Sequence, residues 1–195
     1  MDSKADTDLM AVPDAPIEFD TMVGIPMWPM RIKYFGLFDW EGLYKMVYNW
    51  YQQKGYFYNE TNYSYKVPTP MGAEMKLKCE GWRKTNDYMR EWIYVYYHFF
   101  EMREVEVIKD GKKQKLTKAR FYIELTGMVE MDYHGRWKQT LMGAYLKEFY
   151  HKFIIKKHME LMWWDRLYYR IYKLHGEIKQ FLDMQGKENA YYDVW

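Results

Sequence analysis

The chain has 195 residues, of which 29 are Lys or Arg and 27 are Asp or Glu, giving a formal net charge of +2. This length predicts one large domain that buries roughly 70% of the surface its unfolded chain exposes. The longest uncharged run in the aromatic stretch, Trp92 to Phe100, is too short for a membrane helix of about 20 residues. The first residues are acidic where a secretory signal is basic, so we expect an intracellular, soluble protein.

Residues 1–30 are predicted to form an N-terminal arm outside the domain. Six acidic residues and one basic residue give this segment a net charge of −5, and four prolines disfavour regular structure. Apolar residues, Trp28 among them, supply anchors. Such a segment is either disordered or laid in extended form across another surface.

The following segments alternate between strand and helix patterns. Residues 31–38 predict a strand, and Asp39 is placed to cap a helix that ends near Gly55. Residues 56–66 predict a second strand. From residue 73 to residue 84 apolar and polar residues alternate strictly, which predicts a third strand with one buried face.

The single cysteine, Cys79, lies on the apolar face of that third strand. It has no partner for an internal disulfide, and we interpret it as a small buried hydrophobic residue.

Large residues occupy both faces of the next strand, 88–101, which is typical of a strand covered on both sides. Residues 104–109 and 115–133 flank Asp110-Gly111, a strong hairpin signal. Together these segments predict an α+β fold with a curved antiparallel meander sheet of about six strands.

The apolar period changes to helical spacing near residue 139 and keeps it to about residue 184. A straight helix of this length would span about 65 Å, so we expect a break or an overhang. Residues 31–185 are thus predicted to form a single α+β domain with a long C-terminal helix packed on the sheet. Residues 186–195 are predicted to form an aromatic C-terminal peptide.

This order of elements resembles the START-like helix-grip superfamily, in which a curved sheet wraps the last helix around an apolar cavity. The resemblance is one of architecture, and no functional motif carries it. It implies that Trp164, Tyr168, Ile171 and His175 face the sheet, and that a hydrophobic ligand is bound. The residues that would line such a cavity are Trp92, Tyr94, Tyr96, Phe100, Trp164, Tyr168 and Ile171.

Motifs for catalysis are lacking, so an enzyme is unsupported and no cofactor is predicted. Glu148 and His151 have the spacing of helical carboxylate metal sites, but the second such pair that these sites need is missing. We therefore predict no metal site.

Three functions remain open. The leading hypothesis is a non-enzymatic assembly subunit, a homo-oligomer or part of a larger particle, because the acidic arm and the basic C-terminal helix carry opposite charges. The alternative is a carrier or sensor of an apolar small molecule in a helix-grip cavity. The third is single-stranded nucleic-acid binding by the basic aromatic helix. For assembly, the predicted partner-binding residues are Trp28, Trp163, Tyr169, Tyr191, Tyr192 and Trp195.

Overall fold

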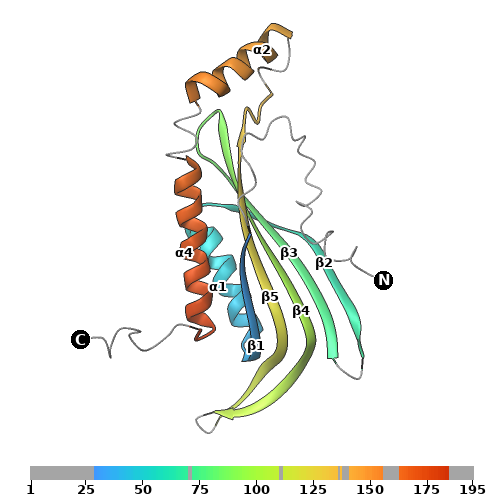
Figure 1. Ribbon diagram of the computed structural model, residues 1–195. Helices are drawn as coiled ribbons and strands as arrows, with labels where there is room; N and C mark the ends of the chain where they lie inside the picture. The colour runs from blue at the N-terminus through green and yellow to red at the C-terminus, as the bar shows by residue number, and fades with distance from the viewer. Residues whose placement is uncertain are drawn as a thin grey trace, which may run out of the picture. The chain divides into compact units, whose positions relative to one another are not determined.

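The computed structural model describes residues 29–69, 72–109, 112–135, 137, 141–155 and 163–184. Residues 1–28 of the predicted N-terminal arm, the Asp110-Gly111 turn and the C-terminal peptide lie outside these residues, whereas Met30, expected in the arm, begins the first strand. The described elements are, in chain order, β1 (Met30–Phe38), α1 (Trp40–Gln53), β2 (Phe57–Thr69), β3 (Gly72–Lys84), β4 (Met89–Lys109), β5 (Lys112–Met131), α2 (Leu141–Phe149), the π-helical segment η3 (Tyr150–Ile155) and α4 (Asp165–Phe181) (Figure 1).

The α+β class and the antiparallel sheet are confirmed, but the sheet has five strands in the order β1-β5-β4-β3-β2. The expected count of about six was wrong because 88–101 and 104–109 belong to one strand, β4. At their junction Glu101 has a φ of 56°. A positive φ at this residue turns the chain locally without ending the strand.

A glycine makes room for that irregularity. Gly72, the first residue of β3, has a φ of 125°, and a Cβ on it would lie 2.5 Å from the carbonyl carbon of Glu101. Only glycine fits this approach of two backbones.

The first and last of the described strands in chain order, β1 and β5, are neighbours in the sheet. β1 pairs with β5 from Met30 opposite Leu125 to Phe38 opposite Thr117. β2 pairs with β3, with irregularities in the register after Glu60 and after Lys66.

Helix α1 begins and ends as its sequence predicts. The Asp39 side chain accepts a hydrogen bond from the backbone nitrogen of Gly42 at 3.0 Å, and Gly55 follows the helix with a φ of 70°. These are an N-cap and a left-handed terminal glycine, which satisfy backbone groups that the helix leaves unpaired.

Aromatic rings fill the space between α1 and the sheet. Phe38 stacks on Phe99 at 5.8 Å between centroids, and Phe99 lies 4.9 Å from Phe121. Trp40 of α1 meets Phe99 edge-on at 4.7 Å. The Tyr51 hydroxyl donates to the backbone oxygen of Ile93 at 3.3 Å. We call this side of the sheet the inner face and the opposite side the outer face.

The C-terminal helix expected from residue 139 to residue 184 is helical where it is described, and residues 156–162, where a break could fall, lie outside the described residues. The described residues form α2, then the π-helical segment η3, and separately α4.

In α4 the buried stripe is rotated about the helix axis relative to the predicted stripe of Trp164, Tyr168, Ile171 and His175. Leu167, Ile171, Leu174 and Ile178 are fully buried, whereas Tyr168 and His175 are half-buried at its margin. Helix α4 lies on the same side of the sheet as α1 (Figure 1), and the Arg170 guanidinium is 3.5 Å from the Tyr56 hydroxyl.

The chain divides into two compact units that share strands. The first contains residues 83–92 and 127–168, and the second contains residues 29–82, 93–126 and 169–184 of the described chain. Strands β3, β4 and β5 contribute residues to both.

Candidate interaction surfaces

Helix α2, in the first unit, exposes its apolar residues. Leu141 is 85% exposed, and Met142 and Tyr145 are each 75% exposed. Leu146 and Phe149 are also exposed. We call these five residues the α2 apolar face.

Lys147, one of the two charged residues of α2, faces the other way. At about 100° per residue, the α2 apolar face covers an arc of roughly 140°, and Lys147 lies nearly opposite its centre. Lys147 is only 8% exposed, and its Nζ is 3.7 Å from Oδ2 of the buried Asp132. A surface helix normally buries its apolar stripe and exposes its charges, so α2 is inverted.

Asp132 forms a turn directly after β5. It has a φ of 54°, its backbone nitrogen donates to the Tyr88 oxygen at 2.7 Å, and its backbone oxygen accepts from Gly135 at 2.8 Å. The same carboxylate raises the pKa of the Tyr88 hydroxyl, second to burial. This turn holds the anion that Lys147 faces, so the orientation of α2 is fixed from its polar side.

The segment η3 continues the exposed apolar surface. Phe153 is 66% exposed and Ile154 is 55% exposed. Lys152 lies over the Phe153 ring at 5.7 Å. The first residue of η3, Tyr150, packs against other rings: it stacks on Trp137 at 5.8 Å between centroids and meets Tyr88 edge-on at 6.3 Å.

A second surface lies in the second unit, on the outer face of the sheet. His98 in β4 bridges two strands there, with its Nδ1 2.8 Å from the Tyr122 hydroxyl and its Nε2 2.7 Å from Glu74 Oε1. Burial lowers the pKa of His98. Hydrogen bonds from Lys66 and His98 lower the pKa of Glu74 to about 2. His98 is therefore neutral and Glu74 charged at neutral pH.

These protonation states define the direction of both hydrogen bonds. Because the Glu74 carboxylate only accepts, Nε2 of His98 carries the proton. Its Nδ1 then accepts from the Tyr122 hydroxyl, which fixes the orientation of that side chain. Arg31 also lies over the Tyr122 ring at 5.4 Å, and its Nε donates to Glu124 at 2.6 Å.

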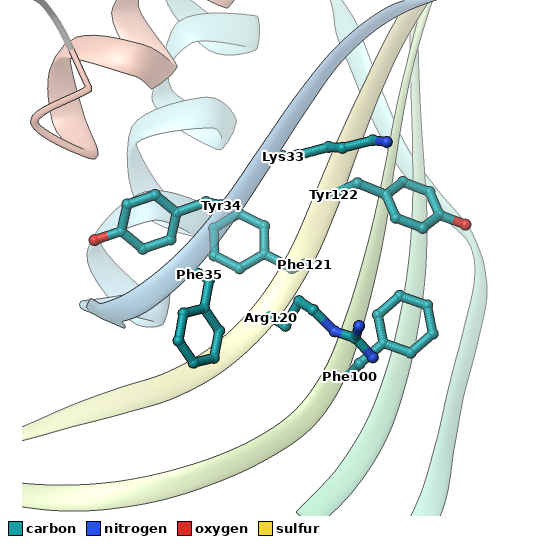
Figure 2. A pocket seen from close by; sticks show the side chains of 7 residues that line it. All are labelled: Lys33, Tyr34, Phe35, Phe100, Arg120, Phe121 and Tyr122. Carbon is teal, nitrogen blue, oxygen red and sulfur yellow. The ribbon is translucent and has the colours of Figure 1, made fainter.

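Beside this network the outer face is hollowed. The hollow has a volume of about 440 Å³ and opens to solvent. Figure 2 shows Arg120 between Phe35 and Phe100, with Lys33 and Tyr122 further along the strands. The full lining consists of Lys33, Tyr34, Phe35, Phe100, Arg120, Phe121 and Tyr122.

The predicted partner-binding residues are only partly described. Trp28, Tyr191, Tyr192 and Trp195 lie outside the described residues. Trp163 is half-buried, and Tyr169 is 62% exposed on α4.

The residues predicted to line a cavity come from two places. On β4 they lie on the outer face, where Trp92 and Tyr94 are buried, Tyr96 and Phe100 are half-buried, and Phe100 lines the hollow. On the C-terminal part Trp164 stacks on Tyr168 at 6.3 Å, and Ile171 is fully buried.

Two features of these surfaces are not apparent from the sequence. The apolar residues of α2 at positions 141, 145 and 149 have the same helical spacing as those of α4, so the pattern does not show that they are exposed. His98 stood alone in an apolar strand, and its partners became apparent only from the pairing of strands β3, β4 and β5.

Among the described residues there is no cluster of three or more potential metal ligands. Within the same segments, every helix is too short or too polar to cross a membrane. Comparison with protein-family models, curated proteins and solved structures finds no match. The resemblance to the START-like superfamily therefore stays a prediction.

Proposed function

We propose that this protein is a non-enzymatic assembly subunit that binds a second copy of itself through the α2 apolar face. The observation that carries this proposal is the inverted helix, with Lys147 buried beside Asp132 and five large apolar side chains in solvent. An exposed apolar patch of this kind marks a protein interaction site.

A second copy suits the chemistry of the face. Leu141, Met142, Tyr145, Leu146 and Phe149 bear no formal charge, so two such faces meet without like-charge repulsion. Contact of a patch with itself is the rule in two-fold symmetric dimers. A membrane surface is a poorer match, because helices that lie in the interface carry many Lys and Arg beside their apolar face, whereas the one Lys of α2 is buried beside Asp132.

Burial of these side chains provides the driving force. Covering one large apolar side chain contributes on the order of 2 kcal/mol, and a symmetric interface covers two sets of five. Tyr145 supplies a ring with few rotors to fix, which is typical of residues that dominate binding.

The two terminal segments of the chain are included in the same proposal. The acidic residues 1–28 and the aromatic residues 190–195 are proposed as further contacts between subunits, with Trp28 and Trp195 as anchors. Trp163 and Tyr169 remain candidates on the C-terminal helices.

Sedimentation velocity over a wide concentration range tests the role of α2. We expect the wild-type chain to shift from monomer to dimer with rising concentration, and Tyr145→Arg to stay monomeric because it buries a charge against the partner. The matched control is Tyr63→Arg on edge strand β2, where Tyr63 is 62% exposed. This control should dimerise as the wild type does.

Two results would contradict the proposal. One is a wild-type chain that remains monomeric at every concentration. The other is equal dimerisation of Tyr145→Arg, with circular dichroism showing that its fold is intact, which would place the interface elsewhere.

A further inference from the structure

The hollow on the outer face has the size and composition of a small-molecule site. Its volume of about 440 Å³ lies within the range of roughly 300–1,000 Å³ found for ligand pockets. Strands β1, β4 and β5 supply its lining, so rigid elements position it. It belongs wholly to the second unit.

Two cations stand at this hollow. Lys33 is exposed and forms no ion pair within the described residues. The Arg120 guanidinium lies over the Phe100 ring at 5.3 Å, and its Nη2 is 3.4 Å from Glu101 Oε1. The ring contact holds the guanidinium, which has five N–H groups and thus keeps donors beyond the one directed at Glu101.

Apolar rings accompany these cations. Phe35 is 67% exposed, and Phe100 and Tyr122 present rings from the neighbouring strands (Figure 2). The hydroxyl of Tyr122 is engaged by His98 at 2.8 Å, so its ring is held in one orientation. Preorganised rings bind a flat apolar ligand at a low cost in side-chain entropy.

We propose that this hollow binds a small aromatic carboxylate. The aromatic body packs on Phe35 and Phe100, and the carboxylate pairs with Lys33 and Arg120. Charge complementarity selects an anion, since Arg120 pairs with Glu101 and no acidic side chain of the described residues pairs with Lys33. Arginine beside a ring favours a planar carboxylate over a neutral ligand.

Isothermal titration of the full chain with 2-naphthoate tests this proposal, with neutral 2-naphthamide as the matched ligand. We expect saturable binding of the acid and at least about tenfold weaker binding of the amide, the loss typical of one charged hydrogen bond. Lys33→Gln and Arg120→Gln should each weaken the binding of 2-naphthoate by a similar factor. Lys113 is an exposed lysine on β5 outside the hollow, so Lys113→Gln should leave the affinity for 2-naphthoate unchanged.

Amide chemical shifts locate the bound acid independently of these variants. We expect saturable shifts confined to β1, β5 and the part of β4 around Phe100. Binding that is absent, or unaffected by both Lys33→Gln and Arg120→Gln, would overturn the proposal. A second result would also overturn it: 2-naphthoate does not bind, but a synthetic peptide of residues 14–28 binds at Lys33 and Arg120. The occupant of the hollow would then be the acidic segment of the chain itself.

Discussion

Gly81 in β3 shows how a single side chain positions α1 on the sheet. A Cβ at this position would lie 2.3 Å from Cε1 of Tyr51, whose ring is fully buried. The ring of Tyr51 occupies the volume that a larger residue in β3 would need. Close packing of this kind leaves no room for an added methyl group.

We therefore expect Gly81→Ala to lower the free energy of unfolding by about 1–3 kcal/mol, the usual effect of overpacking. The matched control is Gly176→Ala in α4, where a Cβ meets nothing within 4 Å. That change should raise stability by about 0.5–1 kcal/mol, because alanine favours a helix. Urea unfolding of both variants measures the difference, and equal effects would contradict this account of Gly81.

Cys79 illustrates what single residues allow to be predicted. Its place in a strictly alternating strand predicted burial, and it is fully buried. Burial raises its pKa to about 12. Its contact with the Tyr58 hydroxyl, at 3.0 Å, could not be predicted because it depends on the irregular register of β2 against β3.

Among the elements, α2 contacts the turn after β5 through the buried ion pair of Lys147 with Asp132. We expect Lys147→Met to loosen the helix from the turn at Asp132, because the carboxylate then loses its buried cation. Amide hydrogen exchange of residues 141–149 should become about tenfold or more faster, while exchange in β4 stays the same.

The control for that change is Lys152→Met, which removes an exposed lysine of η3 that lies over Phe153. It should leave exchange in α2 unaltered. Unchanged exchange in Lys147→Met would show that the ion pair does not hold the helix.

The elements also show where local patterns suffice. Caps and alternation are local, so α1 and the alternating strand β3 could be predicted closely from the sequence. Which face of α2 is buried could not, because α2 and α4 have the same helical period. Inversion of α2 depends on Asp132, a residue outside the helix.

For the whole molecule, acid should reduce stability in two steps. Burial lowers the pKa of His98 below its ordinary 6.5, so the unfolded chain takes up this proton first as pH falls through 6.5. The pKa of Glu74 is about 2 instead of 4.5, so the next loss occurs below pH 4.5. Lys66 and Lys76 face this pair, with Lys66 Nζ 2.9 Å and Lys76 Nζ 3.4 Å from Glu74.

Urea midpoints between pH 7 and pH 3 measure these losses. We expect His98→Gln to reduce the decline that begins near pH 6.5, to which His175 also contributes because burial lowers its pKa, and Glu74→Gln to reduce the one below pH 4.5. An unchanged pH profile in both variants would show that other groups govern acid stability.

The pairing of β1 with β5 has a consequence during synthesis, because β1 is translated well before the strand it pairs with. Arg31 and its partner Glu124 are 93 residues apart in sequence, and a ribosome adds roughly 5–20 residues per second. The first strand to emerge therefore waits roughly 5 to 19 seconds for its partner, with Ile32 and Phe38 among its side chains. During that interval its hydrogen-bonding edge is open to a nascent chain on a neighbouring ribosome, so slower translation of β5 should increase aggregation during expression.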